Sequence, residues 1–302
     1  MVGVAATVGP SSEAAPAKIN LALHVAGRRA DGYHLLDTLV VHGVAADRVD
    51  ARPQGEASTS DEPVPIELAI TGRFAAGLDT GPDNLVLRAA RLLDAEARRL
   101  ARPRRPLALT LEKALPIASG IGGGSSDAAA TLRLLNRLWR LDLPIARLAE
   151  IALPLGADLP MCVHGRPLRA RGIGETIDLF AGLPTLPMVL VNPGVSVATP
   201  AVFRALANRD NPPMPELPPR FRDADHLVDW LATTRNDLEP PAIHVAPVIG
   251  EVLARLGAAP GCRLARMSGS GATCFAIFSD SAAAGAAVAK LPADWWAVAS
   301  AG

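Results

Sequence analysis

The stretch PIASGIGGGSSD, residues Pro116 to Asp127, decides how this chain is interpreted, because it places four glycines within five positions ahead of a helical pattern. Residues without a side chain let backbone N–H groups approach a ligand closely. The apolar residues that follow, among them Ala128, Leu132 and Leu135, recur at helical spacing and predict a helix over 125–139. A glycine loop that runs into a helix directs unpaired N–H groups and the positive end of the helix dipole at one place, which predicts a phosphate site.

Two other glycine-rich nucleotide motifs fit this loop poorly. The P-loop pattern GxxxxGK[ST] is absent, because no lysine follows the glycines. A dinucleotide fingerprint needs a strand that ends directly at the first glycine, whereas residues 116–119 intervene here. The hydroxyls of Ser125 and Ser126 could reach a phosphate oxygen or a Mg²⁺ ion. The remaining alternative is a flexible turn that ends in a serine N-cap.

The composition of the 302 residues indicates a folded protein without a global charge. Hydrophobic residues make up 49% and charged residues 20%, which suits a chain that buries a sizeable core. The 30 basic and 30 acidic side chains cancel, so no overall basic field would recruit nucleic acid or an anionic membrane. The three cysteines predict no disulfide framework, and no apolar run reaches the roughly 18 residues of a membrane span. We therefore expect a cytoplasmic protein.

Strand and helix patterns are mixed without a regular βαβ order and without repeats, which favours an α+β fold. Extended or alternating apolar runs predict strands over 18–26, 33–45, 66–71, 107–112, 188–191 and 273–278. Helical spacing predicts helices over 83–100, with Asp83 as the N-cap, and over 125–139, 147–153, 227–231, 248–256 and 282–291. Proline-rich segments at 53–65 and 208–220 are predicted as surface loops that tune surface behaviour rather than chemistry. The length predicts two domains, over 15–170 and 171–302, after a flexible leader over 1–14.

Four further segments hold residue types suited to chemistry, each with a structural alternative. Lys18 in PAKIN could neutralise charge that develops near a phosphate, or be a solvated strand-edge lysine. Asp158 in GADLP could accept a proton from a substrate hydroxyl, or form a helix cap or turn. Tyr33 and His34 in DGYH suit a flat heterocycle, or follow a DG turn as ordinary strand residues. The segment 267–273, MSGSGAT, could approach phosphates or turn the chain tightly.

Taken in order, these segments resemble the GHMP kinases, a superfamily of small-molecule kinases. The resemblance rests on four stretches: PAKINLALHVAGRRADGYHLLDTL at 16–39, LPIASGIGGGSSDAAATL at 115–132, GADLPMCVHG at 156–165 and ARMSGSGATCFAIF at 265–278. Shorter matches are DNLVLRAARLL at 83–93, NPGVSVATPAVF at 192–203 and RNDLEP at 235–240. The resemblance implies an ATP-binding N-terminal domain of ribosomal protein S5 domain 2-like fold and a ferredoxin-like C-terminal domain.

Within the superfamily, the resemblance is closest to the members that use ATP to phosphorylate the 2-hydroxyl of 4-diphosphocytidyl-2-C-methyl-D-erythritol in non-mevalonate isoprenoid biosynthesis. It implies Lys18 and Asp158 as the catalytic residues, with ATP and Mg²⁺ as the cofactors. Tyr33 and Phe203 would sandwich the cytosine ring. The other substrate contacts would be Asn20, His34, Lys113 and Thr199. ATP would be bound by Asn84, Pro116, Ile117, Ala118, Ser119, Gly120, Ile121, Gly122, Gly123, Gly124, Ser125 and Ser126, the last of which is also the candidate Mg²⁺ ligand.

The glycine loop departs from the family pattern at two positions. The family's loop usually begins PMGGGLGGG, but Ala118 and Ser119 replace two of those glycines here. If either position needs a positive φ, the affinity for ATP or the mobility of the loop will differ.

Two alternatives to this interpretation are another small-molecule GHMP kinase and a catalytically silent nucleotide-binding protein on the same fold. Tyr33, His34 and Phe203 argue against the first, since mevalonate and homoserine carry no cytosine to stack. The presence of both Lys18 and Asp158 argues against the second. We expect a monomer or weak homodimer whose partner is the small-molecule substrate, with neither nucleic acid nor membrane as a partner.

Overall fold

The computed structural model describes residues 11–30 and 32–300, which form two units interleaved along the chain. Unit 1 comprises residues 11–15, 47–114 and 124–164, and unit 2 comprises residues 16–30, 32–46, 115–123 and 165–300. The chain passes between the units inside two long strands, β1 (Ser11–Arg28) and β2 (His34–Pro53). The predicted domain boundary near residue 170 would divide the chain at one position only, and it stays a prediction.

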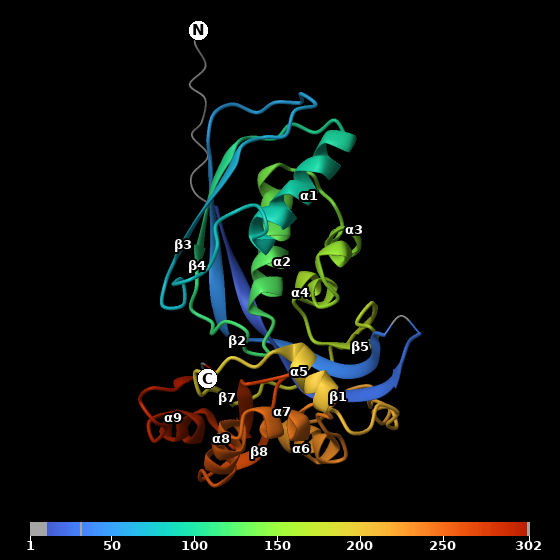
Figure 1. Cartoon of the computed structure of the whole chain (residues 1–302), viewed down its shortest axis with the longest axis vertical. Coiled ribbons are helices and arrows are strands. Elements are labelled where there is room, and N and C mark those ends of the chain that lie inside the picture. Colours follow the sequence, from blue (N-terminus) through green and yellow to red (C-terminus); the bar gives the residue numbers. More distant parts are fainter. Residues whose placement is uncertain (1–10, 31, 301–302) are drawn as a thin grey trace. The chain divides into compact units, whose positions relative to one another are not determined.

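Unit 1 builds its core between strands and four helices. β3 (Ile66–Thr71) runs parallel to β4 (Leu107–Glu112), and residues 48–53 of β2 pair antiparallel with β4. Leu107 and Leu109 of β4 share one core with Leu93 and Leu132, as the strand and helix periodicities require. The helices, which Figure 1 shows grouped together, are α1 (Leu85–Arg99), α2 (Gly123–Leu138), α3 (Ile145–Ala152) and α4 (Leu159–His164), with a 3₁₀ turn at Leu153–Leu155.

Unit 2 contains a four-stranded antiparallel sheet in the order β10-β7-β9-β8. Its strands are β7 (Met188–Asn192), β8 (Cys262–Met267), β9 (Cys274–Phe278) and β10 (Trp296–Ala299). A separate hairpin of β5 (Leu168–Gly172) and β6 (Thr176–Leu179) pairs through β5 with residues 36–40 of β2. The helices are α5 (Thr199–Ala205), α6 (Ala224–Ala232), α7 (Glu239–Val245), α8 (Val248–Gly257) and α9 (Ser281–Val288). Mixed helix and sheet in both units confirm the α+β class.

The strand predictions at 66–71 and 107–112 are confirmed to the residue, whereas β1 begins earlier than predicted. The predicted leader is wrong for residues 11–14, because they belong to β1 and the Glu13 carboxylate pairs with Arg133 and Arg137 at 2.7 Å each. The polar residues of this segment give no strand signal in the sequence, because the arginines that pair with Glu13 lie about 120 positions further along the chain. Residues 1–10 of the predicted leader and residue 31 of the DGYH segment lie outside the described residues.

The predicted N-cap of α1 is wrong by one residue. The helix begins at Leu85, and Asn84 has the extended backbone of a cap while its side-chain oxygen accepts from the Val86 N–H at 2.9 Å. Asp83 therefore stands outside the cap. Several short elements carry no sequence prediction, among them α7, which opens with Pro240 and Pro241 in its first turn. Prolines fit that turn because its N–H groups have no helical partner.

No helix in the described part of the chain combines the length and the apolar character needed to cross a bilayer.

Candidate active site

Lys18 lies in β1 directly against the glycine loop. Its backbone N–H donates to the Ile121 carbonyl at 2.9 Å, and only 4% of the residue is exposed. A Cβ atom at Gly122 would lie 3.2 Å from the Cβ and 3.3 Å from the Cε of Lys18, so glycine there makes room for the lysine stem. Gly122 also has a φ of +64°, which favours glycine. Lys18 is therefore a buried lysine packed on the loop, and the strand-edge alternative is wrong.

Ala118 and Ser119, which replace glycines of the family's loop, differ in backbone conformation. Ala118 adopts a φ of +49°, whereas Ser119 is not among the described residues with a positive φ. The Ser119 hydroxyl donates to the Pro116 carbonyl at 2.7 Å, and its own carbonyl accepts from the Thr273 N–H at 3.0 Å. Ser119 thus closes the turn with its side chain, while Ala118 holds a conformation that costs a residue with a Cβ about 1 kcal/mol.

The second small-residue segment, 267–273, packs tightly against the glycine loop. A Cβ atom at Gly120 would lie 2.5 Å from the Ser268 carbonyl oxygen, and one at Gly269 would lie 2.6 Å from the Gly120 carbonyl oxygen. Real Cβ contacts are never this short, so the two backbones approach as closely as they do only because both positions are glycine. The segment therefore turns tightly and forms the scaffold behind the glycine loop.

Two side chains that the sequence analysis did not single out hold this scaffold. The Asn236 amide nitrogen donates to the carbonyls of Met267 and Gly269 at 2.8 and 2.9 Å. The Glu239 carboxylate accepts from the Met267 N–H at 2.7 Å. Both belong to the RNDLEP segment at 235–240, whose resemblance to the family assigns no role to either residue.

Asn20, two residues beyond Lys18 on β1, is held by two hydroxyl groups. Its backbone N–H donates to the Ser268 Oγ at 3.0 Å, and its side-chain Nδ2 donates to the Thr38 Oγ1 at 2.8 Å. The Ser268 hydroxyl donates in turn to the Gly120 carbonyl at 3.2 Å. Asn20 is 1% exposed, so its side chain has one fixed orientation next to the loop scaffold.

Of the residues predicted to bind the base, all of which lie in unit 2, His34 and Phe203 are in contact with each other. The rings of His34, at the start of β2, and Phe203, in α5, stack with centroids 4.4 Å apart and planes 20° apart. Tyr33 precedes His34 and is 59% exposed, so its ring presents a large surface to solvent. The hydroxyl of Thr199 lies 2.7 Å from the Ser270 hydroxyl, which ties α5 to the scaffold segment. His34, Phe203 and Thr199 thus lie in one unit with Asn20 and Lys18.

The imidazole of His34 is favoured in its neutral form. Burial lowers the pKa of His34, and the positive charges of Arg28 and Arg209 lower it further. Its Nε2 is buried and has no hydrogen-bond partner among the described residues. A neutral ring on a phenyl face keeps one nitrogen able to accept and one able to donate.

Asp158 and the loop serines lie in unit 1. Asp158 immediately precedes α4, and its backbone carbonyl accepts from the Cys162 N–H at 3.2 Å. Asp158 therefore occupies the N-cap position of this helix. Ser125 and Ser126 are in the first turn of α2, and the buried Ser126 hydroxyl donates to the Cys162 sulfur at 3.5 Å. The pairing of Lys18 with Asp158 in catalysis stays a prediction.

Lys113 occupies a buried ion cluster that the sequence analysis missed. Its ammonium group donates to Asp127 at 2.7 Å and, at a short distance, to Asp47, and all three side chains are at most 5% exposed. Burial raises the pKa of the Asp127 carboxyl, while the Lys113 charge opposes that shift. The folded protein therefore holds a proton on Asp127 more tightly than an exposed aspartate would. The substrate contact predicted for Lys113 stays a prediction.

Asn84, predicted to bind ATP, uses both ends of its amide inside the protein. Its oxygen caps α1, and its nitrogen donates to the Asp79 carbonyl at 2.7 Å. The nucleotide contact of Asn84 stays a prediction.

Family models match two parts of the chain, on either side of residue 170. The GHMP kinases N terminal domain matches residues 84–166, and the GHMP kinases C terminal domain matches residues 219–297. Together these parts span more than half of the chain.

Relatives that align with nearly the whole chain identify a family within the GHMP kinases. A protein of Cereibacter sphaeroides named 4-diphosphocytidyl-2-C-methyl-D-erythritol kinase is 53% identical over 286 residues, covering 93% of this chain and 95% of the relative. A protein of the same name from Brucella melitensis is 53% identical over 300 residues, covering 97% and 95%. The crystal structure of a 4-(cytidine 5'-diphospho)-2C-methyl-D-erythritol kinase superposes with a TM-score of 0.72 at 33% identity, covering 97% of this chain and 100% of that chain. The chain therefore belongs to the GHMP kinases and, among them, to the 4-diphosphocytidyl-2-C-methyl-D-erythritol kinase family.

Proposed function

We propose that this chain transfers the γ-phosphoryl group of ATP to the 2-hydroxyl of 4-diphosphocytidyl-2-C-methyl-D-erythritol, giving the 2-phosphate and ADP in the non-mevalonate route to isoprenoid precursors. The observation that carries the proposal is the stack of His34 on Phe203, with Tyr33 next to it in the chain. A cytidyl alcohol has a base for such a group, whereas mevalonate and homoserine have none. The relatives that are 53% identical over most of the chain carry the name of a kinase for this alcohol.

The glycine loop is proposed to hold the triphosphate. Phosphoryl transfer leaves the protein little covalent chemistry, so its task is positioning and electrostatic stabilisation. Backbone N–H groups of residues 120–124 and of the first turn of α2 would donate to the phosphate oxygens, and the Ser125 hydroxyl would add a donor. The close packing of Gly120 on the scaffold segment supports this proposal, because a preorganised loop loses little entropy on binding.

Lys18 and Asp158 are proposed as the catalytic pair. The 2-oxygen of the alcohol forms a bond to the γ-phosphorus, and the bond between that phosphorus and the β,γ-bridging oxygen breaks. The hydroxyl proton passes to the Asp158 carboxylate, and ADP leaves. The Lys18 ammonium, on a stem buried against Gly122, would stabilise the charge that spreads over the transferring group.

Mg²⁺ is proposed to arrive with ATP as the metal–nucleotide substrate. This ion usually keeps several waters and binds through one or two protein groups together with substrate phosphates. The Ser126 hydroxyl, in the first turn of α2, has a sulfur as its acceptor at 3.5 Å. Sulfur is a weak acceptor, so a Mg²⁺ ion could replace this contact and take the hydroxyl oxygen as a ligand.

The test is ADP release with Mg²⁺-ATP and one of three alcohols: 4-diphosphocytidyl-2-C-methyl-D-erythritol, mevalonate or homoserine. We expect turnover with the cytidyl alcohol alone, and the Lys18→Met variant serves as the control for contaminating ATPase activity. Turnover with mevalonate or homoserine instead would assign a different GHMP kinase activity. ATP binding by calorimetry without turnover of any alcohol would show a silent nucleotide-binding protein.

A further inference from the structure

The orientation of the Asn20 side chain is determined by Thr38. The Thr38 hydroxyl carries a single proton, which it donates to the Ala22 carbonyl at 2.7 Å. Since that carbonyl can only accept, the Thr38 oxygen has only its lone pairs left for Asn20. The Asn20 Nδ2 donates to it at 2.8 Å, and the reverse orientation of the amide would place two acceptors together. The backbone carbonyl of Ala22 therefore sets, through Thr38, which way the Asn20 amide points.

This orientation leaves the Asn20 carbonyl oxygen on the opposite side of the amide. Oδ1 is buried and has no hydrogen-bond partner among residues 11–30 and 32–300. Gly269 keeps the space beside it open, since a Cβ atom at that position would approach Oδ1 to 3.4 Å. A buried acceptor without a donor is costly, and such groups in native structures mark a place where a ligand or water completes the hydrogen bonding.

We infer that Thr38 is a positioning residue, which turns the Asn20 carbonyl oxygen toward a hydroxyl group of the bound alcohol. The inference rests on the proposed function in taking Asn20 as a substrate contact, and it adds that the contact is an acceptor and requires an O–H donor from the ligand. Thr38 itself is 2% exposed and acts only through Asn20.

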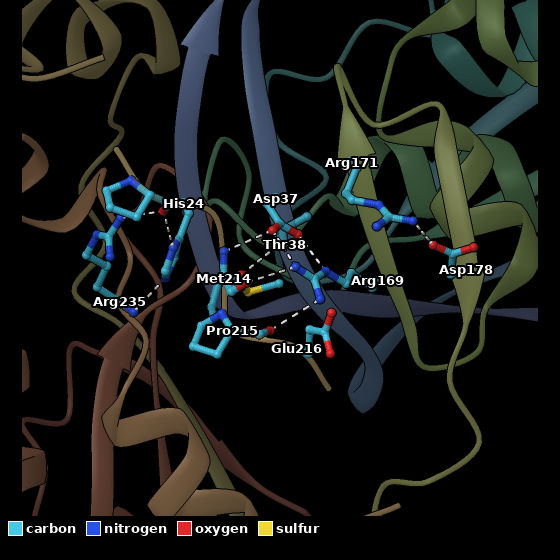
Figure 2. Close-up of polar contacts among 12 residues, drawn as sticks. His24, Asp37, Thr38, Arg169, Arg171, Asp178, Met214, Pro215, Glu216 and Arg235 are labelled. Atoms are coloured by element: carbon cyan, nitrogen blue, oxygen red, sulfur yellow. Dashed lines mark hydrogen bonds and ion pairs between the residues drawn. The ribbon is translucent and has the colours of Figure 1, made fainter. Parts of the chain in front are cut away.

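The strand segment around Thr38 is itself anchored. The neighbouring Asp37 accepts two hydrogen bonds from Arg169, at 2.7 and 2.6 Å, and one from the Met214 N–H at 2.9 Å, as Figure 2 shows. Residues 36–40 of β2 also pair with β5. Because the backbone at Thr38 is held in this way, removing its hydroxyl changes the orientation of Asn20 without releasing the strand.

The decisive variants are Thr38→Val, which keeps the shape and removes the hydroxyl, and Thr38→Ser, which keeps the hydroxyl. Thr234→Val is a matched control, because the buried Thr234 hydroxyl also donates to a backbone carbonyl, of Leu231 at 2.7 Å, and accepts an N–H, from Arg266 at 3.0 Å. We expect Thr38→Val to raise the KM for the alcohol about tenfold while leaving the KM for ATP unchanged. Thr38→Ser should restore the wild-type KM, and Thr234→Val should lower the melting temperature comparably without changing either KM.

A double-mutant cycle separates positioning from a general structural role. If Thr38 acts through Asn20, then Thr38→Val should have no further effect on the KM of an Asn20→Ala enzyme. The inference is overturned if Thr38→Val behaves like Thr234→Val, or if its full effect persists in the Asn20→Ala background. The assay uses whichever alcohol the wild-type enzyme phosphorylates, so failure with the cytidyl alcohol counts against the proposed function alone. If wild type phosphorylates no alcohol, weaker binding of the cytidyl alcohol to Thr38→Val by calorimetry takes the place of KM, with the same outcomes.

Discussion

Arg169 and Asp37 form a two-pronged ion pair in unit 2, in which the Arg169 Nε and Nη2 donate to the two carboxylate oxygens at 2.7 and 2.6 Å. The same Nη2 also donates to the Met214 carbonyl at 3.1 Å, and Nη1 donates to the Pro215 carbonyl at 3.3 Å. The hydrogen bonds to Asp37 raise the pKa of the Arg169 guanidinium. The pair therefore fastens the proline-rich segment 208–220 to strands β2 and β5 (Figure 2).

A second anchor holds the start of the same segment. The Pro212 carbonyl accepts from the Arg235 Nη2 at 2.9 Å and lies 3.0 Å from the His24 Nδ1, while the His24 Nε2 accepts from the Arg235 N–H at 3.1 Å. Burial lowers the pKa of His24, and the two contacts place its single proton on Nδ1. The loop expected to tune only surface behaviour is thus attached to the strands that carry Asn20 and Thr38.

We expect Asp37→Asn to destabilise the protein by about 3 kcal/mol, because it leaves the partly buried Arg169 charge without its counter-ion. The measurement is the free energy of unfolding in urea. Asp178→Asn is the matched control, since Asp178 pairs with Arg171 at the surface, where both side chains are about half exposed. Exposed ion pairs contribute little to stability, so an equal decrease in the free energy of unfolding in the two variants would contradict the anchoring role of Asp37.

Asp158→Asn should lower kcat by about 100-fold or more while leaving the affinity for ATP nearly unchanged, since asparagine cannot accept the hydroxyl proton. Steady-state kinetics with the alcohol substrate and calorimetry with ATP measure the two quantities. Wild-type turnover in this variant would remove Asp158 as the base.

Tyr33→Ala should raise the KM for the cytidyl alcohol about tenfold or more and leave the KM for ATP unchanged, because base stacking contributes roughly 1–3 kcal/mol. Tyr33→Phe, which keeps the ring, should retain the wild-type KM. Equal effects of Tyr33→Ala on both substrates would contradict a stacking role for this exposed ring.

Ala118→Gly should stabilise the protein by about 0.5 kcal/mol, because relief of the left-handed strain outweighs the added freedom of the unfolded chain. Thermal unfolding measures this change, and ATP calorimetry shows whether the loop binds phosphates less tightly once it is more mobile. Ser119→Gly provides the comparison: Ser119 lacks the positive φ and its hydroxyl bonds to Pro116, so its loss should destabilise. Stabilisation by both substitutions would show that the φ of Ala118 is not the cause.

The buried cluster around Lys113 predicts a pH dependence. Burial raises the pKa of Asp127 to about 8 from an ordinary 3.8, so the folded state holds this proton more tightly than the unfolded state. The stabilisation from this proton is complete below about pH 4 and is lost as the pH rises through about 8. Asp127→Asn keeps a neutral group of the same shape, so its free energy of unfolding should decline less than that of wild type between about pH 5 and about pH 9.

Urea unfolding at several pH values measures that difference. Asp142→Asn serves as the control for the loss of one negative charge, since the Asp142 side chain is 85% exposed. The same pH slope in wild type and Asp127→Asn would show that Asp127 is ionised throughout the range.

Features with a local signal are predictable from the sequence. The alternating residues of β3 and the helical spacing of α2 depend on near neighbours in the chain, so their pattern is enough to place them. A side chain whose role depends on a distant partner is not predictable in this way. Nothing in the sequence around Lys113 indicates that it pairs with Asp47, which lies 66 positions earlier. Likewise, the sequence around Thr38 does not indicate that its hydroxyl orients Asn20.

The start of β1 and the whole of α5 also differ from the prediction for lack of a local signal. β1 continues back to Ser11, and in this part of the strand Glu13 pairs with Arg133, which lies 120 positions further along the chain, so no local pattern encodes the contact. Helix α5 was missed because it is short and has a proline in its first turn, which resembles a breaker in sequence but satisfies the helix start.

The fit of Gly120 against Ser268 and Gly269 has a consequence for anyone who recombines these enzymes. Neither backbone leaves space for a methyl group on the other, so a chimera that joins this glycine loop to a 267–273 segment from another protein needs glycine at both contact positions. A crossover between the two stretches that replaces either glycine creates a backbone clash, even when every catalytic residue is retained.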